Sequence, residues 1–277
     1  MDTKKKVRKK AATKKAATNT TDLAVANESA ITIPDWMQSE EIVGVENVGE
    51  HVTTPRLAIV QAMSDEERKE AFGEGGVAIM PDGVQVAAKG EEFIAIPLVF
   101  WASWEVWSDI NDSASPMVEE STQDPTSDIA RRAKNKEARE EAYGDGFKRR
   151  YVESLNFIMQ IDSGEASGEL ATVSFSVGEH YTGSKLCGML KRRPCSIFAN
   201  RIAFKTTSRK RNNRSWYGFD FNNPAEDPIV QDKETYDQLA TVHEDLSRMV
   251  DASKILVNRD DVADGTVAEV VGDDIPV

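Results

Sequence analysis

The middle of the chain alternates short apolar runs with polar turns, which is typical of a β-sheet protein. Runs rich in aromatic and β-branched residues predict five strands. They are expected at residues 93–107, 151–162, 170–177, 196–207 and 215–221. Between the third and fourth runs, Leu186, Met189 and Leu190 recur at helical spacing. A short helix is therefore expected over 184–193, ending before Pro194.

The order of these elements predicts the fold class. Five strands with one helix between the third and the fourth is the layout of the OB-fold barrel, which commonly binds oligonucleotides. The sequence therefore predicts a mainly β protein built on an OB-fold-like five-stranded barrel over residues 93–222. Residues 108–147 break the pattern with acids, Ser, Pro and a charged helical stretch at 128–142. We expect a mobile insertion there.

The segments that flank this body have their own patterns. Residues 1–30 are rich in Lys and Ala and have no apolar period, which predicts a disordered basic arm. Residues 31–92 are expected to form an N-terminal extension that packs on the barrel, and Ser64 with Glu67 predicts the capping box of a helix in it. Three short strands are expected in this extension, at residues 56–62, 77–80 and 84–88.

The C-terminal part of the chain divides into a helix and a tail. Residues 231–252 predict an amphipathic C-terminal helix, because apolar residues recur on one face. Residues 253–277 lose this period and predict a disordered acidic tail, and the last eighteen residues hold six acids and no Lys or Arg.

Charge is unevenly distributed along the chain. The formal net charge is −13, which by itself disfavours a nucleic-acid partner. Residues 1–15, however, carry eight Lys or Arg against one acid, and residues 148–214 carry thirteen against five. Residues 215–277 carry fifteen acids against four bases. The body thus has a basic centre between acidic flanks, and the local field matters more than the total for association with an anion.

Basic and aromatic residues gather in this centre. Sequence-independent binding of a single strand needs cations along a groove and exposed rings on which bases stack. The candidate nucleic-acid-binding residues are Trp101, Trp107, Lys148, Arg149, Arg150, Tyr151, Arg201, Lys205, Arg209, Lys210, Arg211, Arg214, Trp216 and Tyr217. The rings among them could instead belong to the core, as we expect for most of the phenylalanines in these strands.

Signals for catalysis are weak by comparison. Residues 73–76 (GEGG) lack the Lys-Ser/Thr that follows the glycines of a phosphate-binding loop. His180, Cys187 and Cys195 match no standard zinc spacing. We therefore expect no enzyme, no metal and no cofactor, although scattered carboxylates could still assemble a nuclease site.

The sequence also carries information about the compartment. No stretch approaches the ~18 consecutive apolar residues of a membrane span. The basic N-terminus lacks the apolar run of a signal peptide, and two cysteines are too few for a disulfide scaffold. We expect a cytoplasmic protein that does not contact a membrane.

The end of the chain resembles a known tail. Residues Asp273, Asp274, Ile275, Pro276 and Val277 are similar to the acidic tip of bacterial single-stranded DNA-binding proteins, which ends Asp-Asp-Ile-Pro-Phe. In that family the tip recruits replication and repair partners, its aspartates meeting basic residues and its aromatic residue entering a pocket. Val277 replaces that aromatic residue here, so the resemblance implies the charge contacts more than the pocket.

The body resembles phage-encoded single-stranded DNA-binding proteins with an OB-fold and an acidic C-terminus, over residues 54–250. The segments that carry this resemblance are TPRLAIVQAMS, FWASWEVWSDIND, SFSVGEHYTG and SWYGFDFNNP. The resemblance implies a protein that protects single strands during phage replication in an infected bacterial cell, with replication or recombination proteins as partners.

Three other functions fit the same residues. The first is a recombination or annealing factor that binds DNA as a ring or filament. The second is a nuclease or another DNA-modifying enzyme. The third is a scaffold protein whose basic patches contact an acidic protein.

Overall fold

The structure is a computed structural model that describes residues 55–109, 116–143, 147–211 and 214–251. The predicted basic arm and acidic tail lie outside these residues. Within them the protein is mainly β, as predicted. The strands are β1 (Arg56–Ile59), β2 (Val77–Met80), β3 (Val84–Ala87), β4 (Phe93–Asp109), β5 (Pro116–Thr122), β6 (Glu140–Tyr143), β7 (Phe147–Ile161), β8 (Leu170–Phe175), β9 (Ile202–Arg211) and β10 (Arg214–Asn222). The helices are α1 (Glu66–Phe72), α2 (Asp128–Lys134), α3 (His180–Arg192) and α4 (Lys233–Asp251), with 3₁₀ turns η3 (Val177–Glu179) and η4 (Ile197–Ala199).

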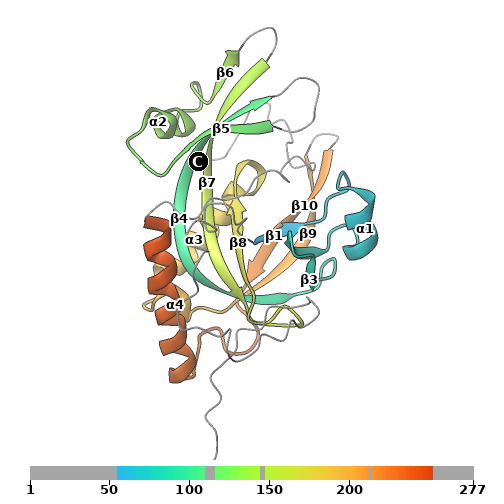
Figure 1. Cartoon of the computed structure of the whole chain (residues 1–277), viewed down its shortest axis with the longest axis vertical. Helices are drawn as coiled ribbons and strands as arrows, with labels where there is room; N and C mark the ends of the chain where they lie inside the picture. The colour runs from blue at the N-terminus through green and yellow to red at the C-terminus, as the bar shows by residue number, and fades with distance from the viewer. Residues whose placement is uncertain (1–54, 110–115, 144–146, 212–213, 252–277) are drawn as a thin grey trace, which may run out of the picture. The chain divides into compact units, whose positions relative to one another are not determined.

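These strands form one sheet that curls into a half-barrel (Figure 1). Its order is β10-β9-β4-β7-β8-β1-β2-β3, while β5 pairs with β4 and β6 pairs with β7. The pairs are antiparallel except that β1 runs parallel to β8, with Arg56 opposite Thr172. The sheet has ten strands rather than five, because the N-terminal extension and the insertion both add strands to it.

The two ends of the curled sheet are joined by side chains. Gln61, just after β1, donates through Nε2 to the carbonyl of Tyr217 on β10 and accepts from its N–H, both at 2.9 Å. Thr206 on β9 donates to the carbonyl of Gly75 at 2.7 Å and accepts from the N–H of Gly90 at 3.0 Å. These bonds satisfy backbone polar groups of β10 and of the turns beside β2 and β3, which have no partner strand there. They link the two ends of the curled sheet.

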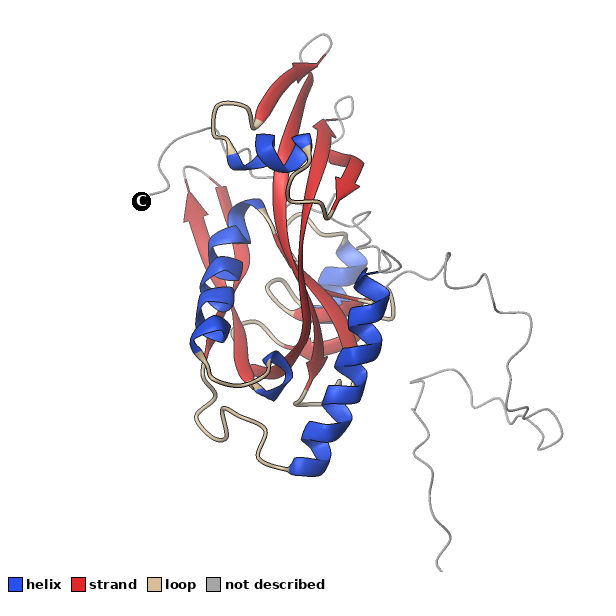
Figure 2. Cartoon of the chain, turned by 90° about the vertical axis from the view of Figure 1, so that its left-hand side faces the viewer, coloured by secondary structure: helices blue, strands red, loops and turns tan. Residues whose placement is uncertain are grey.

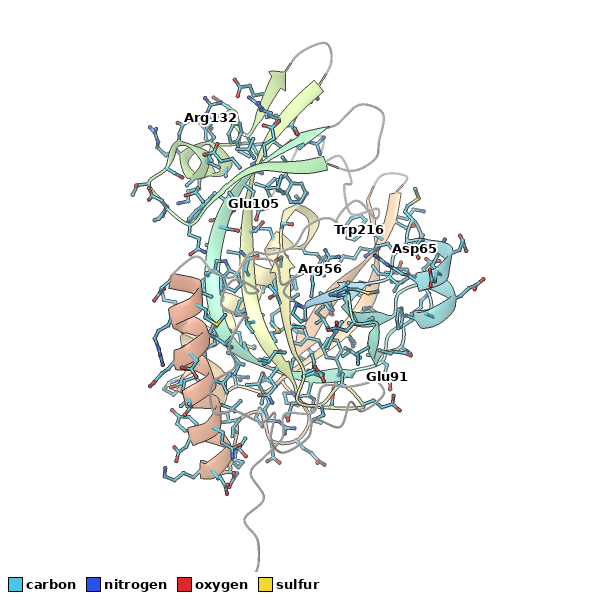
Figure 3. The ribbon with its side chains drawn as sticks, viewed as in Figure 1. Arg56, Asp65, Glu91, Glu105, Arg132 and Trp216 are labelled. Atoms are coloured by element: carbon cyan, nitrogen blue, oxygen red, sulfur yellow. The ribbon has the colours of Figure 1, made fainter. Side chains whose placement is uncertain are left out.

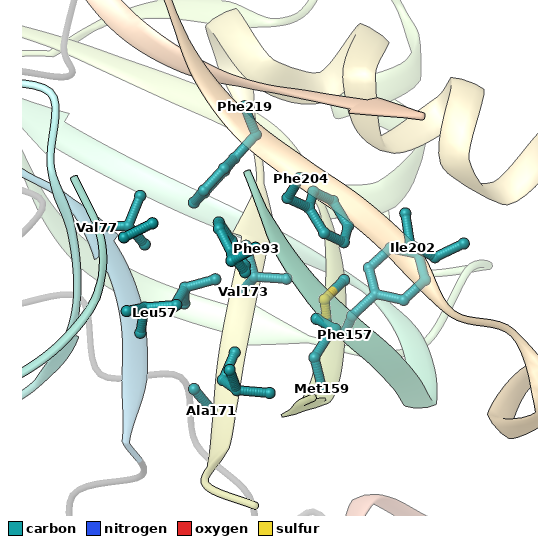
Figure 4. Close-up of a cluster of buried hydrophobic side chains, with 14 of the residues drawn as sticks. Leu57, Val77, Phe93, Phe157, Met159, Ala171, Val173, Ile202, Phe204 and Phe219 are labelled. Carbon is teal, nitrogen blue, oxygen red and sulfur yellow. The ribbon is translucent and has the colours of Figure 1, made fainter. Parts of the chain in front are cut away.

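The core lies inside the curl and is rich in phenylalanine (Figure 4). Phe93 stacks on Phe204 with ring centroids 5.7 Å apart, and Phe219 meets both rings edge-on. Helix α3 packs against this core closely, since a Cβ on its Gly183 would lie 2.6 Å from Cβ of Phe175. Edge-to-face pairs of this kind add to the stability that area burial gives.

A second apolar cluster lies between the sheet and α4. Leu239 and Val250 of the helix are buried, and the ring of His243 is bonded through Nδ1 to the carbonyl of Leu98 at 2.7 Å. This confirms the predicted amphipathic helix. In the part of the chain that is described, no helix is long and apolar enough to cross a membrane.

The described part of the insertion contains two strands and a helix. Strands β5 and β6, helix α2 and the adjoining ends of β4 and β7 form a projection (Figure 1). We call this projection the arm; it is a different segment from the basic arm predicted at residues 1–30. Ile129, Ala130 and Ala133 of α2 are buried against Trp104 and Tyr151, so the arm has a small core of its own. Those three apolar residues were hidden in a segment whose charges dominate its composition.

Two predicted helix starts are wrong. The N-cap of α1 is Asp65, whose carboxylate accepts from the N–H of Arg68 at 2.8 Å, so the expected capping box of Ser64 and Glu67 does not form. The hydroxyl of Ser64 instead accepts from the N–H of Gln61 at 2.9 Å. Helix α3 begins at His180, ahead of the expected start at residue 184, because η3 leads directly into it.

Candidate nucleic-acid interface

A cleft with a volume of about 140 Å³ opens between β1, the end of β8 and β10. Two of its lining residues, Arg56 and Trp216, are labelled in Figure 3. Trp107 from the base of the arm and Trp216 from β10 both line it. Arg56 from β1 and Arg68 from α1 line it as well. The cleft therefore combines aromatic rings with guanidinium groups from segments that lie far apart in the sequence.

The hairpin of β9 and β10 forms one side of this cleft. Its register pairs Arg209 with Trp216 and Lys205 with Asp220, and directly opposed residues share a face of an antiparallel pair. The opposite face carries Phe204 and Phe219, which belong to the core. One face of the hairpin thus belongs to the core, as expected for most phenylalanines of these strands, and the other carries Arg209 and Trp216.

The tip of the hairpin carries further predicted residues. Arg211 pairs with Arg214 at the end of the ladder, and Lys210 pairs with Ser215 next to it. Lys210 is exposed, while the side chains of Arg211 and Arg214 lie outside what the structure describes. The backbone alone therefore brings three cations to one end of the hairpin.

Arg209 is held by groups of the protein itself. Its Nη1 lies 3.1 Å from Oε1 of Glu179, which lines the cleft, and its Nη2 donates to the hydroxyl of Thr182 at 2.9 Å and to the carbonyl of Phe219 at 2.5 Å. Gly218 makes room for the ion pair, because a Cβ there would lie 2.2 Å from Oε1 of Glu179. The guanidinium is consequently fixed beside the cleft.

Glu179 is an acidic group in a basic setting. Its side chain is 17% exposed, and within the described residues neither carboxylate oxygen accepts a well-aligned hydrogen bond. Burial raises the pKa of Glu179, and this outweighs the lowering by the charge of Arg209 and by contact with Trp216. A buried ion pair whose carboxylate is this poorly satisfied is expected to contribute little to stability.

Tyr217 is anchored next to the cleft. Its hydroxyl accepts from Nζ of Lys89 at 2.6 Å, and the same ammonium lies 4.7 Å from the centroid of its ring. A Cβ on Gly75 would approach that ring to 3.0 Å. The ring is half-buried, so only part of it can contact a ligand.

Trp107 is nearly covered. It is 4% exposed, and its indole N–H donates to Oε2 of Glu105 at 2.8 Å. Ser103 donates to the other oxygen of this buried carboxylate at 3.0 Å. Trp107 therefore forms a wall of the cleft rather than a free stacking surface.

The predicted basic cluster of the arm is matched by acids. Arg149 lies 2.8 Å from Glu119 of β5, and Lys148 and Arg150 each lie 3.8 Å from Glu140 of β6. Tyr151 is buried, and its hydroxyl donates to Glu141 at 2.9 Å. These four predicted residues thus stabilise the arm, and their contribution to a phosphate-binding field is largely compensated.

Two predicted residues lie away from the cleft. Trp101 is 7% exposed and packs beneath α4, so the expectation of an exposed ring is wrong. Arg201 precedes β9, and its Nε lies 2.6 Å from Asp162. At about 3.3 Å per residue along a strand, Arg201 is roughly 26 Å from Arg209. Neither belongs to the same surface as Trp216.

Sequence reasoning missed Arg56 and Arg68. Both lie in the N-terminal extension, which the parallel pairing of β1 with β8 and the bonds of Gln61 to Tyr217 bring to the body. No local motif signals such a pairing. The only local signal was Arg56 itself, at the start of the short strand β1.

The described residues hold no cluster of three or more His, Cys, Asp or Glu that could bind a metal ion. Cys187 faces the core, and burial raises the pKa of its thiol to about 11. Cys195 donates weakly to Asn200 at 3.7 Å, and His180 contacts Glu153 at 3.0 Å. The three residues considered for zinc thus have separate surroundings.

Comparison with known proteins places the chain in a family. Residues 25–249 match the family described as Pam3 phage gp34-like protein. The chain belongs to this family. No curated protein and no solved structure matches it. The match covers all but the last two described residues and relates the chain to a phage protein, as the sequence resemblance implied.

Proposed function

We propose that this gp34-like protein binds and protects single-stranded DNA, without catalysis, during phage DNA replication or recombination in the infected cell. The observation that carries the proposal is the pairing of Arg209 with Trp216 on one face of the β9–β10 hairpin, beside a cleft lined by Arg56. A partly exposed indole next to a guanidinium that is held in place is suited to base stacking with phosphate neutralisation.

The connectivity of the body supports an OB-like barrel at the centre of the larger sheet. Strands β4, β7, β8, β9 and β10 lie side by side in the order β10-β9-β4-β7-β8, and α3 lies between β8 and β9 in the chain. OB-folds bind oligonucleotides on the face of their second and third strands and on the loops that join strands one to two and four to five.

The residues that line the cleft are consistent with such a binding face. Val173 and Ser174 of β8, the third strand of this set, line it. Trp107 stands where the first strand enters the arm, and Trp216 stands near the turn between the fourth and fifth strands. Geometry and fold thus favour the same ligand.

The chemistry favours an unpaired strand. A ring in a cleft can stack only on a base whose face is free, whereas bases in a duplex are covered by their neighbours. Cations at the hairpin tip would neutralise phosphates and release counterions. The acidic tail, with Asp273 and Asp274 near its end, would recruit replication or recombination proteins.

The proposal is tested with a hairpin variant, Lys210→Gln with Arg214→Gln. Its control is Lys233→Gln with Arg248→Gln, which removes two cations that are exposed on α4 and paired with Asp237 and Asp245. We expect the hairpin variant to bind a labelled single strand less tightly, with a salt slope smaller by about 1.4 for two lost contacts. Equal binding by both variants would contradict the proposal, and metal-dependent cleavage of the DNA would indicate a nuclease.

A further inference from the structure

We propose that the outer face of α3 continues the path of the nucleic acid beyond the cleft. This inference rests on the proposed function and extends it to a surface that the candidate residues do not include. The bound species is the same single strand, leaving the cleft past Trp216 and following the helix.

The charge of α3 supports this path. The helix holds Lys185, Lys191 and Arg192 and contains no Asp or Glu. All three cations are exposed. In a protein with a net charge of −13, a helix without any acid forms a local basic surface. Such a surface attracts anionic groups, including the phosphates of a nucleic acid.

The face also presents an aromatic ring. Tyr181 is 65% exposed. It is the most exposed aromatic residue in the described part of the chain. Tyr181, Lys185, Gly188 and Arg192 fall on one stripe at a period of 3.6. Nζ of Lys185 lies 4.5 Å from the centroid of the Tyr181 ring. A ring and a cation held together can contact a base and a phosphate of one strand.

Gly188 on this stripe is not required by packing. A Cβ at this position would meet only Nη1 of Arg192, at an ordinary 3.6 Å, whereas Gly183 on the buried side of the helix has no such room. Glycine in a helix interior is less favourable than alanine. Its presence on the open face leaves the backbone accessible to a chain that approaches closely.

The stripe begins next to the cleft. Helix α3 follows η3 directly, and a Cβ on Gly178 of η3 would lie 3.7 Å from Nε1 of Trp216. The hydroxyl of Thr182, adjacent to Tyr181, accepts from Arg209 at 2.9 Å. Helix α3 runs beside the hairpin (Figure 2) and is about 20 Å long at 1.5 Å per residue, so it offers several nucleotides of additional path.

The test compares two lengths of oligonucleotide, about 6 and about 16 nucleotides, which lie within the range of sites on one OB-fold. The variant is Lys185→Gln with Arg192→Gln, and the control is again Lys233→Gln with Arg248→Gln on α4. Affinities are measured at about 50 mM salt, where contacts with phosphates are strongest.

We expect the α3 variant to bind the long strand roughly sixtyfold less tightly, since two phosphate contacts of about eightfold each are lost at this salt, and the short strand as the wild type does. Tyr181→Ser should act in the same length-dependent way. Unchanged affinity for both lengths, or an equal loss for both, would overturn the α3 path while the cleft proposal stands. Failure of the wild type to bind either strand would instead contradict the proposed function.

The predicted acidic tail is the alternative occupant that the test has to exclude. The same variants are therefore measured in a chain that lacks residues 260–277. An effect of the α3 variant that persists without the tail supports contact with DNA. An effect that disappears with the tail would assign the face to the tail and overturn the proposal.

Discussion

Glu179 places a carboxylate inside the cleft, and its replacement by glutamine gives a sharp test of the site. The Glu179→Gln change keeps the shape of the side chain and removes its charge. Arg209 should stay in place, because the hydroxyl of Thr182 and the carbonyl of Phe219 still accept from it. The guanidinium then has no intramolecular counter-charge and can pair with a phosphate.

The magnitude follows from one additional contact. Each phosphate neutralised on a single strand adds about 0.7 to the magnitude of the slope of log K against log salt. At about 50 mM salt this corresponds to a roughly eightfold gain in the affinity for DNA. Fluorescence anisotropy of a labelled single strand, titrated at several salt concentrations, measures both quantities. The control is Asp162→Asn, which frees Arg201 from a similar ion pair far from the cleft and should leave binding unchanged.

The same variant should alter the dependence on pH. Because burial raises the pKa of Glu179, its proton binds as the pH falls through this raised value, and the wild type should then bind DNA more tightly. The folded state disfavours the charged carboxylate, so Glu179 lowers the unfolding free energy as the pH rises through the same range. The glutamine variant should lack both effects. Weaker binding by the variant, or an unchanged salt slope, would refute the assignment of Arg209 to the interface.

Three further changes test other parts of the site. Trp216→Ala should weaken single-strand binding by about 1–3 kcal/mol if a base stacks on the indole, and thermal unfolding shows whether the fold is intact. Gly218→Ala should lower the unfolding free energy by roughly 1–3 kcal/mol, because the new Cβ displaces the buried pair of Glu179 and Arg209; unchanged denaturant unfolding would contradict that packing. Removal of residues 260–277 should strengthen DNA binding more at low than at high salt, since a tethered acidic tail competes for the same cations; identical titrations would exclude this competition.

The sequence predicts the body well where one face of a strand is buried. The alternation of Phe204 with Lys205, and of Phe219 with Trp216, is local, so it gives the two faces of the hairpin without knowledge of the partners. The amphipathic C-terminal helix is visible for the same reason. Both patterns depend only on the period of the element.

Contacts between distant segments are not visible in this way. Arg56 reaches the cleft because β1 pairs in parallel with β8, and Trp101 lies in the apolar cluster that α4 covers. The basic residues of the arm look like a binding patch until Glu119 and Glu140 are found beside them. Such pairings depend on tertiary structure, and composition cannot distinguish a compensated cation from a free one.

The central claim is that the cleft takes an unpaired strand, and a fluorescence titration tests it most directly. The five tryptophans include Trp107 and Trp216, which line the cleft, so a bound base should quench part of the emission. The titration compares single-stranded and double-stranded DNA of equal length at two salt concentrations. We predict tighter binding of the single strand. We also predict that log K falls by about 0.7 per phosphate contact for each tenfold rise in salt concentration. Equal affinity for the duplex, or binding that does not change with salt, would contradict the account.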